Sequence, residues 1–209
     1  MGLSTSGPQD RTPQELITEL RGLTDVDWPT VWSGPPYPGK GLDMWCAQFA
    51  WVPTSFERVL QVRTDTGGSF TLNNLGGSWA PVTHVSHWLW GASAEGVEDN
   101  PAVLTETARA WPPYLTAACA VLGEPTWEGA WDSEDFPESL GDYDTGSREY
   151  RSEQQSPHRL AYWMPRQATD PLVILEVFLK LDTVGPEPRR GAANMSIEFR
   201  PRPVEIGAS

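Results

Sequence analysis

Two histidines at a spacing of three, His84 and His87 in the run HVSH, are the first candidates for chemistry in this sequence. On a helix this spacing would place both imidazoles on one face, where they could share a metal ion. On a strand it places them on opposite faces. Because residues 81–90 alternate as a strand does, we expect one histidine in the core, one at the surface, and no shared metal.

Nucleophilic chemistry has candidate thiols in Cys46 and Cys119. Both lie in apolar surroundings, where a thiol stays protonated and unreactive, and two cysteines do not make a disulfide framework. Residues 76–80 read GGSWA and miss the nucleophile-elbow pattern GxSxG. The sequence has no HExxH, no paired CxxC, no P-loop and no GxGxxG after a strand. We therefore expect no catalytic residue, no cofactor and no bound metal.

Carboxylates are concentrated in residues 124–153, which hold ten acids against two arginines, or −8 of the total charge of −13. The acids are Glu124, Glu128, Asp132, Glu134, Asp135, Glu138, Asp142, Asp144, Glu149 and Glu153. An EF-hand calcium loop is not predicted, because Pro137 falls where a turn glycine is needed. A solvated charged segment is the simpler interpretation.

Aromatic residues accompany the start of this acidic segment. Most of the 11 tryptophans must be buried, since each covers a large apolar area. Those beside the acids are expected to be partly exposed, and tryptophan is enriched at binding hot spots while clustered carboxylates attract a basic partner. The predicted partner-binding residues are Trp127, Trp131, Asp132, Glu134, Asp135, Asp142 and Asp144. The alternative is that the tryptophans only attach the segment to the core.

Composition restricts the classes of partner. A net charge of −13 argues against nucleic acid and against an anionic membrane surface. No apolar run approaches the ~20 residues of a membrane span, and residues 1–10 lack the features of a secretory signal. Only two of the 15 basic residues are lysines, a bias that indicates a GC-rich genome such as that of an actinobacterium.

Residues 99–127 give the strongest helix signal. Asp99 and Asn100 can cap a helix that Pro101 begins, and Gly123 can end it. An apolar stripe at helical spacing is formed by Leu104, Ala108, Trp111, Leu115, Cys119 and Leu122. Because Pro112 and Pro113 interrupt the hydrogen-bond ladder, we expect either a kinked helix or two helices in near continuation.

The remaining elements follow from shorter patterns. Residues 12–24 predict a helix with a capping box. Residues 28–41, rich in proline and glycine, predict a loop whose Trp28 and Trp32 either cover the core or belong to a binding surface. Residues 42–52 fit either a helix or a strand. Residues 56–75 predict a hairpin, residues 81–90 a strand, 171–182 a central strand and 195–199 a last strand.

This order of elements predicts an α+β fold: a largely antiparallel sheet covered on one face by a long, proline-kinked central helix. The expected organisation is a flexible tail over residues 1–11, one domain over residues 12–201 and a tail over residues 202–209. Within the domain, the acidic segment should form a mobile loop at about residues 132–157 because its second half has few apolar residues.

The run LGEPTW at residues 122–127 resembles a pattern in small actinobacterial proteins that look like immunity proteins of toxin loci. The resemblance includes the irregular stretch after this run and the paired strands at residues 160–163 and 172–181. It implies a cytoplasmic, non-catalytic module that neutralises a toxin or another basic protein, and it assigns no functional residues. The alternative hypothesis is a small hydrolase-like enzyme whose active site follows no motif. A deep pocket with convergent polar groups would favour the enzyme.

Overall fold

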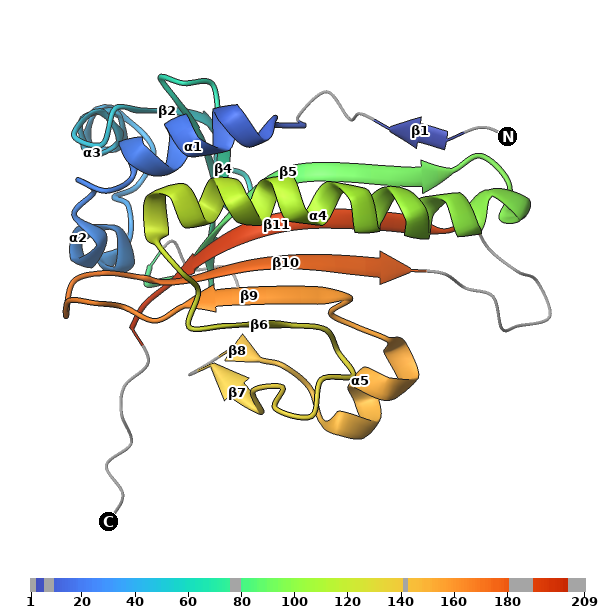
Figure 1. Ribbon diagram of the computed structural model, residues 1–209. Helices are drawn as coiled ribbons and strands as arrows, with labels where there is room; N and C mark the ends of the chain where they lie inside the picture. Colours follow the sequence, from blue (N-terminus) through green and yellow to red (C-terminus); the bar gives the residue numbers. More distant parts are fainter. Residues whose placement is uncertain (1–2, 6–9, 76–79, 141–142, 181–189, 203–209) are drawn as a thin grey trace, which may run out of the picture.

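A nine-stranded antiparallel sheet forms the framework of the protein in the computed structural model, which describes residues 3–5, 10–75, 80–140, 143–180 and 190–202. Eight strands follow the order β2-β3-β4-β5-β11-β10-β9-β6, and β1 pairs with the far end of β5. The long helix and the N-terminal helices lie against one face of the sheet (Figure 1). The predicted α+β class with a largely antiparallel sheet is therefore confirmed.

The strands are β1 (Leu3–Thr5), β2 (Trp51–Ser55), β3 (Leu60–Thr64), β4 (Ser69–Asn74), β5 (Val82–Ala94), β6 (Trp127–Gly129), β7 (Ser139–Leu140), β8 (Tyr143–Asp144), β9 (Arg159–Trp163), β10 (Leu172–Lys180) and β11 (Ala192–Arg200). The helices are α1 (Pro13–Gly22), α2 (Trp28–Ser33), α3 (Lys40–Ala47), α4 (Asn100–Leu122) and α5 (Arg148–Gln154), with a short 3₁₀ turn η1 (Val97–Asp99) before α4.

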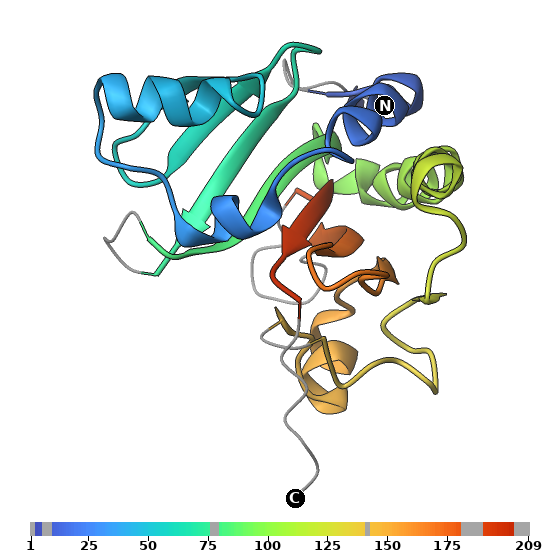
Figure 2. The ribbon, with the colours of Figure 1, turned by 90° about the vertical axis from the view of Figure 1, so that its left-hand side faces the viewer.

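The strand predictions hold where side chains alternate. In β11 every second residue is buried, and β3 and β4 form the expected hairpin, with Val62 opposite Phe70. The predicted central strand, β10, is an interior strand between β11 and β9. The sheet twists strongly, so that β2, β3 and β4 cross the direction of β9 and β10 (Figures 1 and 2).

Helix α4 contradicts the predicted proline kink, because it runs as one continuous helix of 23 residues through Pro112 and Pro113 (Figure 1). Each proline removes one helical N–H donor, which frees the carbonyls of Ala108 and Arg109. Both prolines and both of these residues are exposed, so water can satisfy the freed carbonyls. The cost of the two missing hydrogen bonds is thereby reduced.

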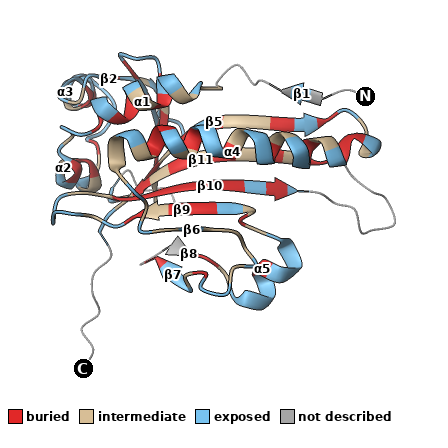
Figure 3. Ribbon diagram, viewed as in Figure 1, coloured by how far each residue is buried: buried red, intermediate tan, exposed pale blue. Residues whose placement is uncertain are grey.

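The buried face of α4 also differs from the predicted stripe. Leu104 is 38% exposed and Ala108 is exposed, whereas Trp111 is buried as expected. The residues that face the sheet and α1 are Asn100, Val103, Thr107, Trp111, Tyr114, Ala117 and Ala118. The side of the helix in contact with the core is therefore rotated by about one residue from the stripe. Figure 3 shows α4 alternating between buried and exposed along its length.

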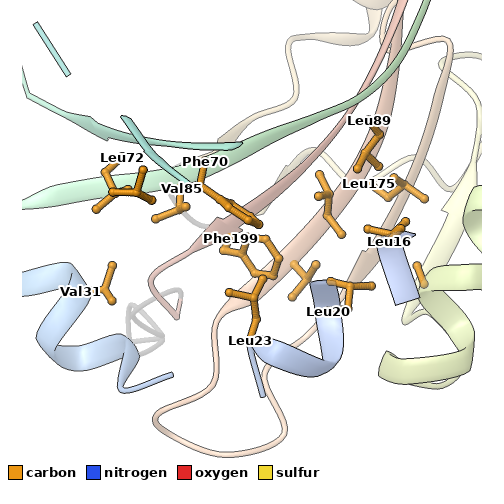
Figure 4. Close-up of a cluster of buried hydrophobic side chains, with 14 of the residues drawn as sticks. Leu16, Leu20, Leu23, Val31, Phe70, Leu72, Val85, Leu89, Leu175 and Phe199 are labelled. Atoms are coloured by element: carbon orange, nitrogen blue, oxygen red, sulfur yellow. The ribbon is translucent and has the colours of Figure 1, made fainter. Parts of the chain in front are cut away.

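Helix α1 has the predicted capping box, in which the Thr12 hydroxyl accepts from the Glu15 amide and Glu15 accepts from the Thr12 amide. Its apolar side chains point toward the sheet, and Figure 4 shows Leu16 and Leu20 near Leu175 and Phe199. On the same helix, Glu19 is buried. This carboxylate accepts a hydrogen bond from Thr66 and lies 3.5 Å from Arg11. These contacts tie α1 to the turn between β3 and β4.

Two expectations for the N-terminal third are wrong in part. Residues 28–41 were expected to be a loop, but they contain α2 and the first turn of α3, with Trp28 stacked on Phe199. The expected tail over residues 1–11 contributes β1, and the Arg11 amide donates to the Leu89 carbonyl. Residues 42–52, left open between helix and strand, hold most of α3 and the start of β2.

The acidic segment covers the second face of the sheet near β9 and β10. Residues 132–157 were expected to form a loop without regular structure, yet β7, β8 and α5 lie within them. Phe136 and Leu140 are buried against Leu160, Leu172 and Ile174, and these side chains form a separate small core. The expectation of an unstructured loop is therefore wrong for the described residues, while the predicted mobility stays a prediction. Residues 203–209, in the predicted C-terminal tail, lie outside the described part.

Within the described ranges, no helix combines the length and the apolar character that crossing a membrane would require.

Candidate functional site

Trp127 is the best-anchored of the predicted partner-binding residues. It lies on the edge strand β6 opposite Tyr162 of β9, and its ring meets Phe136 edge-on at 5.0 Å between centroids. Its indole N–H donates to the Asp135 carboxylate at 3.0 Å. The ring also passes so close to Gly129 that a Cβ atom there would come within 2.6 Å of it. Trp127 and Asp135 are thus brought together, but as a contact that fixes the local fold.

Arg151 and Phe136 attach the rest of the acidic segment to this anchor. Arg151 is 5% exposed, its guanidinium carbon lies 4.3 Å from the centroid of the Phe136 ring, and it donates to the Gly146 carbonyl. Sequence reasoning missed both roles, because it counted Arg151 only in the charge balance of the segment and assigned Phe136 no role. The signal that could have indicated these two roles is the presence of a large apolar residue, Phe136, and a later cation, Arg151, in an otherwise acidic stretch.

The carboxylates of this segment face solvent. Asp132, Glu134 and Asp135 are exposed, and so are the other five acids whose side chains are described: Glu124, Glu128, Glu138, Glu149 and Glu153. Asp142 lies outside the described residues, and Asp144 lies in β8 with its side chain outside them. Of the two arginines in the segment, Arg148 is exposed and Arg151 is buried. Among the acids and arginines whose side chains are described, the exposed groups carry a charge of −7 (eight acids and Arg148), compared with −6 when the buried Arg151 is also counted.

Local hydrogen bonds hold this surface in place. Glu149 is in the first turn of α5, where its own backbone amide, the Ser147 hydroxyl and nearby arginines lower the pKa of its carboxyl. Glu128 accepts from the Trp111 indole N–H of α4 at 3.0 Å. Burial and Arg159 lower the pKa of His158, and Asp132 partly opposes this shift. Trp131, next to Asp132 in the sequence, is half-buried.

The two histidines of the HVSH run lie on opposite faces of β5, as a strand requires. His87 is 2% exposed and stacks on Phe70, with Nδ1 2.7 Å from the Ser69 carbonyl oxygen. His84 lies on the other face, half-buried. Burial lowers the pKa of both imidazoles. A metal shared by the two rings is excluded by this geometry.

Neither cysteine is placed for nucleophilic chemistry. Cys46 is fully buried in α3, and burial raises the pKa of its thiol to about 11. Cys119 is half-buried in α4, and burial together with Glu124 and Glu128 raises the pKa of its thiol. Both thiols are free and stay protonated at neutral pH.

Within the part of the chain that the structure describes, no three or more His, Cys, Asp or Glu side chains are grouped closely enough to hold a metal ion. Comparisons with protein-family models, with curated proteins and with solved structures gave no match to this chain.

Proposed function

We propose that the protein is a non-catalytic binding module for a basic protein, and that its contact surface is the solvent side of the acidic segment. The observation that carries the proposal is the asymmetry of charge exposure in residues 124–153. Eight described carboxylates face solvent beside one exposed arginine, while the second arginine is buried under the segment. A surface of this kind attracts a cationic partner and increases its rate of association.

The structure changes which aromatic residue we expect to contribute. The Trp127 side chain donates a hydrogen bond to Asp135 and packs against Phe136 and Gly129, so replacing Trp127 should damage the fold. Trp131 is half-buried and adjoins Asp132 in the sequence, and a partly exposed indole can supply the desolvated centre that charges alone do not. We therefore assign Trp131 the role of the apolar contact.

The resemblance to immunity proteins gives the partner a class. On that basis, the module acts in the cytoplasm and neutralises a toxin encoded near its own gene, and the first partner to test is the product of the neighbouring gene. An immunity function requires tight and specific inhibition, whereas a general binding role requires association alone. Loss of the partner's toxic activity on adding the protein therefore distinguishes the two.

Binding should be compared between two variants of equal charge. The first carries Asp132→Lys, Glu134→Lys and Glu138→Lys and leaves the anchoring Asp135 in place. The matched control carries Glu57→Lys, Asp65→Lys and Glu95→Lys, which are exposed acids outside the segment. Each triple substitution raises the net charge from −13 to −7, since every acid-to-lysine change adds two charges.

Calorimetry with the purified partner should show at least tenfold weaker binding for the first variant and a much smaller loss for the control. Equal losses in the two variants would mean that net charge, and not this surface, governs binding. Unchanged affinity of the first variant would exclude the acidic segment as the contact surface.

A further inference from the structure

A cleft of about 580 Å³ opens at the end of the molecule where α1, α2, α4 and the loop between β9 and β10 meet. Helices α1 and α4 both end at this side of the molecule (Figure 1), and Figure 2 shows it face on. The volume falls in the range of sites for small molecules. The cleft lies on the face of the sheet opposite the small core beneath the acidic segment.

The floor of the cleft consists of side chains that belong to the main hydrophobic core. It is formed by six side chains that are each 5% exposed or less: Leu20, Leu23, Trp28, Trp163, Val173 and Phe199. Three of them are aromatic, and Trp28 stacks on Phe199 at 5.1 Å between centroids. The Trp163 indole N–H is already donated to the Gly123 carbonyl, at 2.8 Å. Trp28 is also stacked on Trp32 at 5.0 Å between centroids, so both faces of its ring are covered, and the floor offers a ligand closely packed apolar groups.

The rim is polar and carries more negative than positive charge. It includes the carboxylates of Asp27 and Asp170 and the guanidinium of Arg166. Arg166 donates to the Leu122 carbonyl at 2.7 Å, so it compensates the negative end of α4. The last turn of α1 contributes Leu20 to the cleft, and Leu23 and Thr24 follow that turn. The carbonyl groups at the C-terminal end of α1 therefore add negative potential to the cleft.

From this combination we infer that the cleft is a binding site for a small amphiphilic cation, with an apolar body that rests on the apolar floor and an ammonium group that Asp27 and Asp170 attract at the rim. An anion of the same shape would meet two carboxylates at the rim and would bind more weakly. The site does not depend on the acidic segment, so it can be tested without the protein partner.

The test compares two probes with the same indole body and opposite charge, tryptamine and indole-3-acetate, by calorimetry against the wild-type protein. We expect tryptamine to bind at least fivefold more tightly. In the double variant Asp27→Asn and Asp170→Asn, this preference should fall below twofold. Both changes keep the side-chain size and an oxygen acceptor for the Thr30 hydroxyl and the Gln167 amide, which these carboxylates now bind.

A second pair of variants tests the location. Thr169→Trp places a large ring at the exposed rim and should abolish tryptamine binding. Thr105→Trp, on the exposed side of α4 near its other end, should leave binding unchanged. Equal affinity for the two probes, no binding of either probe, or tryptamine binding that survives Thr169→Trp would each overturn the inference.

Discussion

Trp127 and Trp131 are four residues apart, yet they occupy different environments. Trp127 is held by a hydrogen bond to Asp135 and by the ring of Phe136, whereas Trp131 is half-buried beside exposed carboxylates. The sequence grouped both tryptophans as partner-binding residues because their neighbours have the same composition. Only the three-dimensional positions of Asp135 and Phe136 separate an anchor from a contact residue.

His87 provides a prediction for pH at the same scale. Burial lowers its pKa, with smaller opposing effects from the Ser69 carbonyl and Glu19. The unfolded chain therefore binds a proton at higher pH than the folded protein does, and this histidine reduces stability as the pH falls below about 6.5. This loss of stability is complete only when the pH is below the lowered pKa of His87 in the folded protein. Its Nε2 has no hydrogen-bond partner among the described residues, so protonation gains no compensating contact.

The measurement is the free energy of unfolding in urea between pH 7.5 and pH 5 for the wild type and for His87→Gln. We expect the variant to be less stable at pH 7.5 and to lose less further stability as the pH falls. A pH dependence that is identical in the wild type and His87→Gln would show that the imidazole does not titrate as proposed.

At the scale of elements, α4 shows which part of a helix its sequence can define. Its limits and length were predictable from caps and from an apolar stripe, because both depend on local spacing. Its orientation about its own axis was not, because small residues such as Ala117 and Ala118 face the core where α1 approaches closely. The continuity through Pro112 and Pro113 was also unpredictable, since it depends on which carbonyls reach water.

Two neighbouring residues of α4 test this orientation. Val103 is fully buried and Leu104 is 38% exposed, although leucine is the larger residue and belongs to the predicted stripe. Val103→Ala should lower the free energy of unfolding by about 2 kcal/mol through lost burial and a small cavity. Leu104→Ala should lower the free energy of unfolding by less than about 1 kcal/mol, and chemical denaturation measures both losses. A larger loss for Leu104→Ala than for Val103→Ala would mean that the helix is rotated toward the predicted stripe.

Arg151 gives a prediction for α5 and the acidic segment. Its guanidinium is buried over Phe136 and binds the Gly146 carbonyl, so it connects α5 to the small core. Arg151→Ala should release this part of the chain and make residues 145–157 an early site of limited proteolysis. The neighbouring exposed Arg148→Ala should leave the cleavage rate unchanged. Equally rapid cleavage of the wild-type protein would mean that the contact does not restrain the segment.

At the scale of the whole molecule, the sheet was largely predictable and the cover of its second face was not. The strand β11 and the hairpin of β3 and β4 are predicted by the local alternation of their residues. Burial of β10 on both faces leaves no alternation, and it requires a second cover, which the acidic segment provides through Phe136 and Leu140. The cleft is formed by four separate stretches of chain, so no local pattern in the sequence could indicate it.

The two proposed sites occupy different parts of this architecture. The acidic segment covers one face of the sheet near its β6 edge, and the cleft opens among the helices on the other face. The first presents exposed charge and suits a large partner, while the second is a cleft with an apolar floor and suits a small one. Charge reversal in the acidic segment should therefore leave tryptamine binding unchanged.

The central claim is that the acidic segment attracts a basic protein, and the association rate as a function of ionic strength tests it most directly. Stopped-flow mixing with the partner should give a wild-type rate that falls steeply as salt rises from 20 to about 300 mM, because screening weakens long-range attraction. The variant with Asp132→Lys, Glu134→Lys and Glu138→Lys should associate at least tenfold more slowly at low salt and show a flatter salt dependence. Trp131→Ala should mainly increase the dissociation rate. Equal association rates and equal salt dependence for the wild type and the charge-reversed variant would contradict the claim.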